Sequence, residues 1–349
     1  MLKERGTTIA VTGLFACVIG LCGPIKGSVA GIIAPNSIVA TEAQSPLSST
    51  TRSSAGGGAD SALDLRIVFY GYPKIGVPLS GTGVISERGL SNIRDITFSL
   101  IGGELSPNGR FIAYDNCSTV NRGIYLAEAD GRNAQLVIPL SGSPCVDVRW
   151  SLDGAKLSYV AQSARSLRIF DIASKSDTVI PNTQGADWHS WSPAGHEIVY
   201  GRSRGRVGVG PVGRLLYITD LEGNSRQLTF AKDFAPCDRE RNLIDTWAPA
   251  WSPAGNTIAF TQCERLFVIS PTGNHLRQLT TPLYASRPSP KVPVTSAYSP
   301  RWSPDGRWII FVGDNDVLKR ISADRNTIVE IGKLPYRGGP FSVAPFNKQ

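Results

Sequence analysis

The stretch Arg-Trp-Ser-Pro-Asp-Gly at residues 301–306, followed by Ile-Ile-Phe at 309–311, is one of five copies of a single motif. Its serine recurs at positions 106, 151, 192, 252 and 303, so successive copies lie 45, 41, 60 and 51 residues apart. Such spacings are typical of β-propellers, in which each repeat forms one four-stranded blade. The motif therefore predicts an all-β fold made of repeated antiparallel blades.

The residues of each copy explain its local structure. An apolar residue on an inner strand leads into the Ser-Pro-Asp-Gly turn, where proline presets φ and glycine supplies a positive φ, so the chain reverses tightly. A strand of the type Ile-Ala-Phe follows, then a third strand such as residues 216–218 and a fourth such as residues 226–229. Because no unit shows a helical period of apolar residues, we expect strands throughout.

This series of motifs carries a family resemblance. Trp-Ser-Pro-Asp-Gly, an Ile-Ala-Phe strand, Leu-Tyr-Ile at 216–218 and Arg-Gln-Leu-Thr at 226–229 together resemble the TolB-type β-propeller repeat, a relative of the WD repeat. The resemblance covers about residues 64–346 and implies a propeller, but it does not specify a function. TolB proteins carry an α/β domain before the propeller, whereas a Ser/Thr/Gly-rich stretch occupies that place here.

The segments outside the five motifs predict how the ring closes. Residues 65–70 read as the second strand of a blade and residues 91–97 as its fourth, so this blade lacks an inner strand. Residues 339–346 resemble the approach to a motif turn but have no blade of their own. We expect this C-terminal segment to supply the missing strand, which protects the open sheet edges and makes six blades.

The N-terminal region reads as a targeting segment followed by a tether. Lys3 and Arg5 precede an apolar stretch over residues 9–25, and small residues at 28–30 suit a signal peptidase. We therefore predict a signal peptide at 1–30, a flexible tether at 31–63 and a propeller domain at 64–349. The alternative is an uncleaved membrane anchor. Either interpretation places the propeller outside the cytoplasm, periplasmic or secreted, with membrane contact only through an uncleaved segment.

Four cysteines remain once the leader is set aside, and all lie in predicted loops. They are Cys117, Cys145, Cys237 and Cys263. Three pairings are formally possible, and the loops between second and third strands emerge on the same face as the loops between blades. We therefore expect the disulfides Cys117–Cys145 and Cys237–Cys263, in keeping with an oxidising compartment. A metal site is the alternative, but no Cys-x-x-Cys or nearby histidine pair supports it.

Signals for catalysis or a cofactor are weak. The three histidines, His189, His196 and His275, have no spacing that suits a metal cluster, and no Gly-x-Ser-x-Gly elbow is present. Residues 314–316 lack the rest of a calcium-binding loop. Residues 208–213 match a dinucleotide fingerprint by letter, but a strand rather than a helix follows them. We expect no catalytic residue, no metal and no cofactor.

A cluster of four arginines is the clearest candidate for a binding surface. It comprises Arg202, Arg204, Arg206 and Arg214, around a long glycine-rich loop. The net charge is +8 for the chain and +6 without residues 1–30. A basic surface attracts anionic proteins, lipids or polysaccharides, although a solvated loop would explain the same charges. No nucleic-acid recognition motif is visible in this exported chain, so we expect no nucleic-acid partner.

These observations leave two classes of function. We predict a non-enzymatic binding scaffold outside the cytoplasm that engages a protein or an anionic envelope polymer through one propeller face or the central channel. The alternative is a propeller enzyme, a hydrolase or lyase acting on carbohydrate, ester or peptide bonds. Its candidate carboxylates are Asp147, Asp187 and Asp245 near the inner strands, which equally suit turn capping or pairing with Arg149 and Arg301.

Overall fold

The computed structural model describes twelve stretches of the chain, all within the second of its two compact units, Ser53–Gln349. They are residues 65–72, 80–86, 89–95, 100–116, 121–141, 146–161, 165–204, 213–234, 246–282, 292–324, 327–334 and 337–345. The predicted signal peptide and tether lie outside these stretches. Within them, no helix has the length and apolar character needed to cross a membrane.

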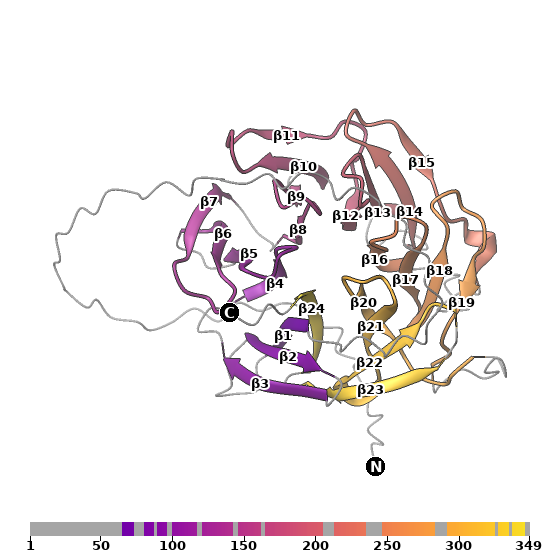
Figure 1. The fold of residues 1–349 in the computed structure, drawn as a ribbon. Coiled ribbons are helices and arrows are strands. Elements are labelled where there is room, and N and C mark those ends of the chain that lie inside the picture. Colours follow the sequence, from indigo (N-terminus) through magenta and orange to yellow (C-terminus); the bar gives the residue numbers. More distant parts are fainter. Residues whose placement is uncertain are drawn as a thin grey trace, which may run out of the picture. The chain divides into compact units, whose positions relative to one another are not determined.

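Six four-stranded antiparallel sheets form the ring of a β-propeller (Figure 1), which confirms the predicted fold class and blade number. The strands of each blade are given from the inner strand outward. Blade 1 consists of β24 (Arg337–Pro345), β1 (Leu65–Tyr72), β2 (Ser80–Ser86) and β3 (Gly89–Asp95), and blade 2 of β4 (Leu100–Leu105), β5 (Phe111–Asn116), β6 (Gly123–Glu128) and β7 (Gln135–Pro139). Blade 3 consists of β8 (Val148–Trp150), β9 (Lys156–Ala161), β10 (Ser166–Asp171) and β11 (Asp177–Val179).

Blades 4 to 6 repeat this order of strands. Blade 4 consists of β12 (Ala186–Trp191), β13 (Glu197–Arg204), β14 (Gly213–Asp220) and β15 (Ser225–Gln227). Blade 5 consists of β16 (Thr246–Trp251), β17 (Ile258–Gln262), β18 (Arg265–Ile269) and β19 (Arg277–Gln278). Blade 6 consists of β20 (Tyr298–Trp302), β21 (Trp308–Val312), β22 (Val317–Ser322) and β23 (Ile328–Lys333). Two single-turn 3-10 helices, η1 (Ala231–Asp233) and η2 (Asp314–Asp316), lie in connections.

The ring closes through β24, as the leftover segments predict. This strand pairs antiparallel with β1 over almost its whole length, from Leu65 opposite Pro345 to Tyr72 opposite Arg337. Phe341 on β24 is fully buried together with Ile67 and Phe69 of β1. The last described strand of the chain is therefore the inner strand of the first blade.

The motif residues build one hydrogen-bonded turn, repeated around the ring. In blade 6 the hydroxyl of Ser303 accepts a hydrogen bond from the backbone N–H of Trp308, 3.0 Å away, and donates one to the carboxylate of Asp305. The N–H of Gly306 donates to the carbonyl of Ser303 at 2.8 Å, and Gly306 has a φ of 71°. This positive φ explains the glycine, and the paired side chains explain the serine and aspartate.

Hydrogen bonds also join the inner strands of successive blades. The backbone N–H of Trp150 donates to Glu104 Oε2 at 2.8 Å, and that of Trp251 donates to Ser190 Oγ at 3.1 Å. Each acceptor belongs to the previous blade and stands two residues before that blade's motif serine. Apolar clusters fill the space between the blades, so the core of the propeller is divided among the blade interfaces.

Candidate functional site

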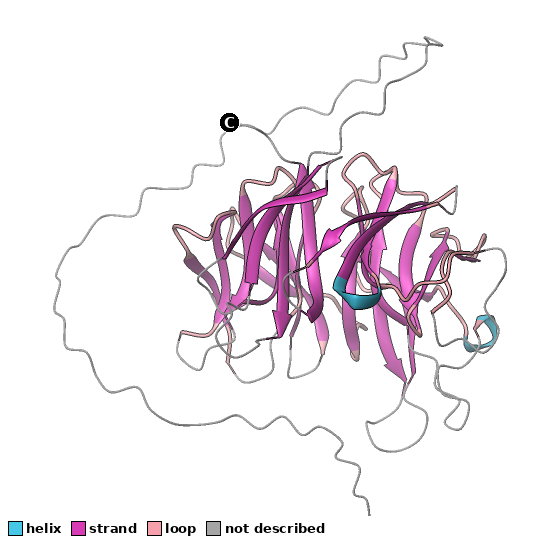
Figure 2. Ribbon diagram, turned by 90° about the horizontal axis from the view of Figure 1, so that it is seen from below, coloured by secondary structure: helices cyan, strands magenta, loops and turns pink. Residues whose placement is uncertain are grey.

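The propeller has two ends with different chemistry, which we name here. The motif face carries the five Ser-centred turns and the turns between third and fourth strands. The loop face carries the connections between second and third strands and those from blade to blade. Figure 2 shows the strands running between these two ends. Because each inner strand follows a connection from the previous blade, its first residues lie at the loop face.

At the motif face, aromatic and proline residues frame the end of the channel. A cavity of about 190 Å³ is lined there by the motif tryptophans and the prolines that follow them, Trp150, Trp191, Trp251, Trp302, Pro193, Pro253 and Pro304. The four tryptophans are each less than a tenth exposed, because they also pack between blades. Leu152, which replaces proline in its turn, is 49% exposed. This end of the channel is therefore mostly structural.

Inside the channel wall, a charged cluster connects blades 2, 3 and 4. The guanidinium of Arg149 lies 2.9 Å from Asp147 Oδ1 and 4.0 Å from Glu104 Oε1, and its Nε donates to the carbonyl of His189 at 3.1 Å. Burial raises the pKa of Asp147 to about 6, although Arg149 and Arg301 lower it. The cluster thus holds a carboxyl group that titrates near neutral pH.

Ser158, His189 and Asp147 form a chain that resembles a catalytic triad. Ser158 Oγ lies 2.8 Å from His189 Nε2, and His189 Nδ1 lies 3.6 Å from Asp147 Oδ2. Both Ser158 and His189 are fully buried, so no substrate can reach the hydroxyl. Burial and the charge of Arg149 lower the pKa of His189 to about 3, so the imidazole is neutral at physiological pH. This arrangement offers no accessible nucleophile.

The predicted arginine cluster divides between two sides of blade 4. Arg202 on β13 lies opposite Leu215, and Ser203 lies opposite Arg214 on β14. Side chains that lie opposite each other share a face of the sheet and successive residues alternate, so Arg202 and Arg214 point in opposite directions. Arg206 and the side chain of Arg204 lie outside the described residues.

Arg214 belongs to a site at the loop face that we call the Arg214 site. Its guanidinium lies 3.8 Å from the ring centroid of Trp247 on blade 5, and its Nε lies 2.8 Å from Asp187 Oδ2. Arg165 lies 2.6 Å from the same oxygen, and the ring of Trp188 lies 6.2 Å from that of Trp247. Trp247 remains 37% exposed. A cation and an exposed aromatic ring are thus held rigidly together.

The backbone at this site is strained in two neighbouring blades. Trp247 and Tyr298, at equivalent positions on β16 and β20, each precede a break in strand register. The next residues, Ala248 and Ser299, have φ values of 47° and 49°, which are unfavourable for residues with a side chain. Tyr298 is 40% exposed. Strained bulges that present exposed aromatic residues are typical of functional sites.

The sequence contains a signal for this site that is separate from the motif turns. Trp247 and Tyr298 both stand four residues before a motif tryptophan, in Trp-Ala-Pro-Ala-Trp and Tyr-Ser-Pro-Arg-Trp. Asp187 occupies the same position before Trp191. These residues lie at the start of the inner strands, where an exposed aromatic residue has no role in the core.

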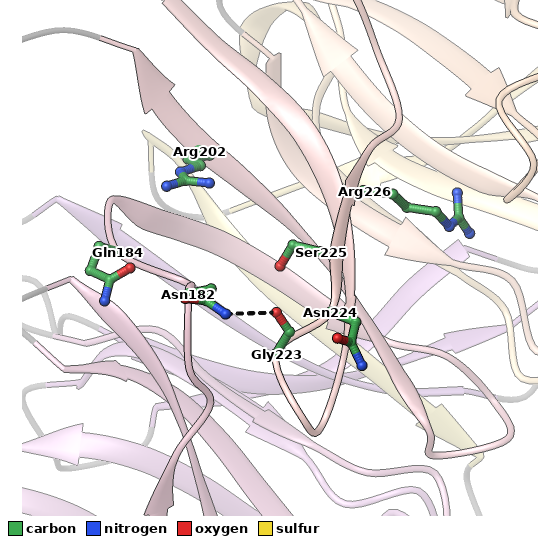
Figure 3. A pocket seen from close by; sticks show the side chains of 7 residues that line it. All are labelled: Asn182, Gln184, Arg202, Gly223, Asn224, Ser225 and Arg226. Atoms are coloured by element: carbon green, nitrogen blue, oxygen red, sulfur yellow. Dashed lines mark hydrogen bonds between the residues drawn. The ribbon is translucent and has the colours of Figure 1, made fainter.

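Arg202 lines a separate groove between blades 3 and 4, which we call the Arg202 groove. Its volume is about 630 Å³, and Gly223 is among the residues that line it (Figure 3). The side chains that line it are Asn182, Gln184, Arg202, Asn224, Ser225 and Arg226. They come from three segments: the connection between β11 and β12, the strand β13, and the β14–β15 turn with β15. The described residues of its lining include no carboxylate and no aromatic ring.

The other candidate residues are scattered. Asp187 pairs with arginines at the Arg214 site, Asp147 lies in the channel wall, and Asp245 lies outside the described residues. His196 and His275 are exposed. Among the described residues, no group of three or more His, Cys, Asp or Glu is arranged to hold a metal ion. Asp314 Oδ2 accepts hydrogen bonds from Thr295 and Ser296.

Two further predictions fall on loops. Cys263 lies in the turn between β17 and β18 with a φ of 49°, whereas Cys117, Cys145 and Cys237 lie outside the described residues, so both disulfides stay predictions. Of the glycine-rich stretch 208–213, only Gly213 is described, and it begins the strand β14. A phosphate-binding helix therefore does not follow this stretch.

Comparisons with known proteins show the fold. No protein-family profile matches the sequence. The structure of TolB from Acinetobacter baumannii is similar, with a TM-score of 0.59 and 16% identity over 81% of this chain and 67% of that chain. Putative TolB from Agrobacterium tumefaciens gives 0.53 and 14% over 82% and 100%. A chain of a nidogen/laminin complex gives 0.58 and 8% over 80% and 98%. The TolB-type resemblance is thereby confirmed for the fold.

Proposed function

We propose that this TolB-type propeller is a non-enzymatic binding scaffold outside the cytoplasm, and that it holds a partner protein on its loop face at the Arg214 site. The observation that carries the proposal is the pair formed by Arg214 and Trp247, in which an exposed indole is fixed beneath a guanidinium. Asp187 holds that guanidinium in place. The site is therefore organised before any partner arrives.

The composition of the site favours a protein partner over a polymer of sugars or lipid. Tryptophan, tyrosine and arginine are the residues that contribute most often to the energetic centre of protein interfaces. Trp247, Tyr298 and Arg214 bring these three types to the loop face. Rigid aromatic side chains lose little conformational entropy on binding, which raises affinity for a given contact area. The nidogen/laminin complex shows a propeller of this kind in a structure of a protein assembly.

The experiment is a quantitative pull-down from an envelope extract with the wild-type protein and two variants. Trp247→Ala removes the exposed indole. Phe230→Ala is the matched control, because Phe230 is 44% exposed and also has a cation nearby, with Lys232 5.7 Å from its ring. We expect a partner protein that is recovered by wild type and Phe230→Ala but lost with Trp247→Ala. Equal recovery by all three proteins would reject this surface.

A second candidate is an enzyme that uses a channel carboxyl group as a general acid. The observation in its favour is Asp147, whose pKa burial raises to about 6, close to the value that suits proton transfer at neutral pH. Screening of hydrolase and lyase substrates with wild type and Asp147→Asn, with and without chelator, separates the two functions. Activity that disappears in Asp147→Asn, with a melting temperature that is not lowered, would favour the enzyme.

A further inference from the structure

The Arg202 groove has the chemistry of a site for an acidic sugar. We propose that this groove between blades 3 and 4 binds a carboxylate-bearing oligosaccharide, with Arg202 holding the carboxylate and the amides around it holding the hydroxyl groups. The proposal does not rest on the proposed function, because Arg202 and the Arg214 site lie on opposite sides of blade 4. A volume of about 630 Å³ lies within the usual range for small-ligand sites.

Arg202 is the cation that this groove offers to a ligand. Its guanidinium carbon lies 5.6 Å from the ring centroid of Tyr217, and Tyr200 also contacts it, so the half-buried side chain is fixed from within the blade. Among the described residues, no carboxylate lies within 4.0 Å of its nitrogen atoms. A positioned guanidinium without an acidic partner is suited to bind a carboxylate through two parallel hydrogen bonds.

Arg226, the other arginine of the lining, is already engaged. Its Nη1 donates to the carbonyl of Pro271 at 2.7 Å, on the neighbouring blade 5, and its Nη2 lies 3.7 Å from Glu197 Oε1. In Figure 3 its side chain extends away from the amides of the groove. Arg202 is therefore the residue that sets the charge of the ligand.

The amides around Arg202 present both donors and acceptors. The amide nitrogen of Asn182 donates to the carbonyl of Gly223 at 3.3 Å, and that of Asn224 donates to Asp220 at 2.7 Å, which leaves both amide oxygens as acceptors (Figure 3). Ser225 Oγ accepts from the hydroxyl of Tyr200 at 3.3 Å and keeps its own proton to donate. Gln184 makes no side-chain hydrogen bond within the described residues.

This combination selects a class of ligand. Sugar hydroxyl groups both donate and accept, so they match a lining that mixes amide oxygens, an amide nitrogen and a hydroxyl. The absence of an aromatic or large apolar side chain from the lining gives an aromatic ligand nothing to stack on. The described lining has no carboxylate, so the negatively charged ligands that hold a hard cation are missing there. A single guanidinium then favours an acidic over a neutral sugar.

The test is a calorimetric titration of the full chain with two tetrasaccharides of matched length. Hyaluronan tetrasaccharide carries glucuronate, and the chitotetraose is fully N-acetylated and therefore neutral. We expect the acidic probe to bind at least about tenfold more tightly, and Arg202→Gln to weaken it at least about tenfold. Arg132→Gln, which removes the same charge from a side chain that is 74% exposed on blade 2, leaves the affinity unchanged. We expect Arg202→Lys to bind the acidic probe more tightly than Arg202→Gln but more weakly than wild type, because lysine cannot form two parallel hydrogen bonds to a carboxylate.

Gln184→Ala keeps the proposal testable if Arg202→Gln does not fold. Gln184 is exposed and its removal breaks no bond within the described structure, so the melting temperature stays unchanged while the acidic probe binds about fivefold more weakly. The proposal is overturned if hyaluronan tetrasaccharide does not bind, if chitotetraose binds equally well, or if neither variant weakens binding. Inorganic phosphate that binds as tightly as the tetrasaccharide would show an anion site without sugar recognition and would overturn it as well.

Discussion

The guanidinium of Arg214 on blade 4 lies 3.8 Å from the ring centroid of Trp247 on blade 5, so one side chain joins two blades at the loop face. The same guanidinium is held by Asp187, which in turn pairs with Arg165 of blade 3. Blades 3, 4 and 5 are therefore linked in series, through Asp187 and then through Arg214, to the exposed indole of Trp247.

Removing this cation should loosen the junction. We expect Arg214→Gln to lower the free energy of unfolding by about 1–3 kcal/mol, because the cation–π contact and the charged hydrogen bond to Asp187 are both lost in a partly buried place. Arg132→Gln, whose side chain is 74% exposed, should change it by less than about 0.5 kcal/mol. Urea unfolding measures both, and equal effects would show that the Arg214 contacts add no stability.

Two glycines at the same motif position should respond differently to alanine. Gly109 and Gly195 have φ values of 69° and 72°, so both substitutions carry a similar backbone strain of about 1 kcal/mol. A Cβ at Gly109 would lie 2.5 Å from the carbonyl oxygen of Pro345 on the closing strand, whereas a Cβ at Gly195 meets nothing within 4 Å. Gly109→Ala should therefore lower the melting temperature clearly more than Gly195→Ala. A similar loss in both would place this closing contact in doubt.

The closing strand should be essential for stability. Phe341→Ala opens a cavity at a fully buried position between β24 and β1, and we expect a loss of about 3–5 kcal/mol in chemical unfolding. Val329→Ala on the outer strand β23 is the control, because Val329 is 38% exposed and should cost less than about 1 kcal/mol. A small loss for Phe341→Ala would mean that the ring is stable without a well-packed closure.

Asp147 should make stability depend on pH. Its pKa is raised to about 6 in the folded protein, so the folded state binds this proton more tightly than the unfolded state does. The contribution of this group is therefore fully present below about pH 4 and is lost as pH rises through about 6. We expect Asp147→Asn, which cannot ionise, to gain about 2–3 kcal/mol relative to wild type between pH 4 and pH 7.

His189 changes stability with pH in the opposite direction to Asp147, and it is present in both wild type and Asp147→Asn. Its pKa is lowered to about 3, so its contribution grows as pH rises from about 3 to about 6.5. The difference between wild type and Asp147→Asn removes this common part, which is why the variant is measured at several pH values instead of wild type alone. A difference that does not change with pH would show that the Asp147 pKa is close to its ordinary value.

The fold could be predicted because the motif residues act through the nearby backbone. Ser303 bonds to Asp305 and to the backbone of Gly306 within four residues, and the same backbone bond from glycine to serine closes the turn in all five copies. Counting copies then gives the blades, and the unpaired segment at 339–346 reveals the closure. Each of these steps needs only local chemistry and the rule that sheet edges must be covered.

The binding sites could not be predicted in the same way. The arginines are close in sequence, but the alternation of side chains along β13 and β14 sends Arg202 and Arg214 to different neighbouring blades. Trp247 lies more than thirty residues beyond Arg214 and reaches it only because blades 4 and 5 are adjacent. The groove likewise requires Asn182, Arg202 and Ser225 to converge from three segments. Such contacts depend on the assembled ring and not on any local pattern.

The pairing of Leu65 with Pro345 has a consequence for how the protein is made. A ribosome releases β1 long before β24, so the first blade waits with a bare edge until the last strand emerges. Such a distant pairing is slow to form and leaves the unfinished ring open to association with other chains. A nascent or truncated molecule that lacks residues 337–345 is therefore the species that chaperones and proteases are most apt to meet.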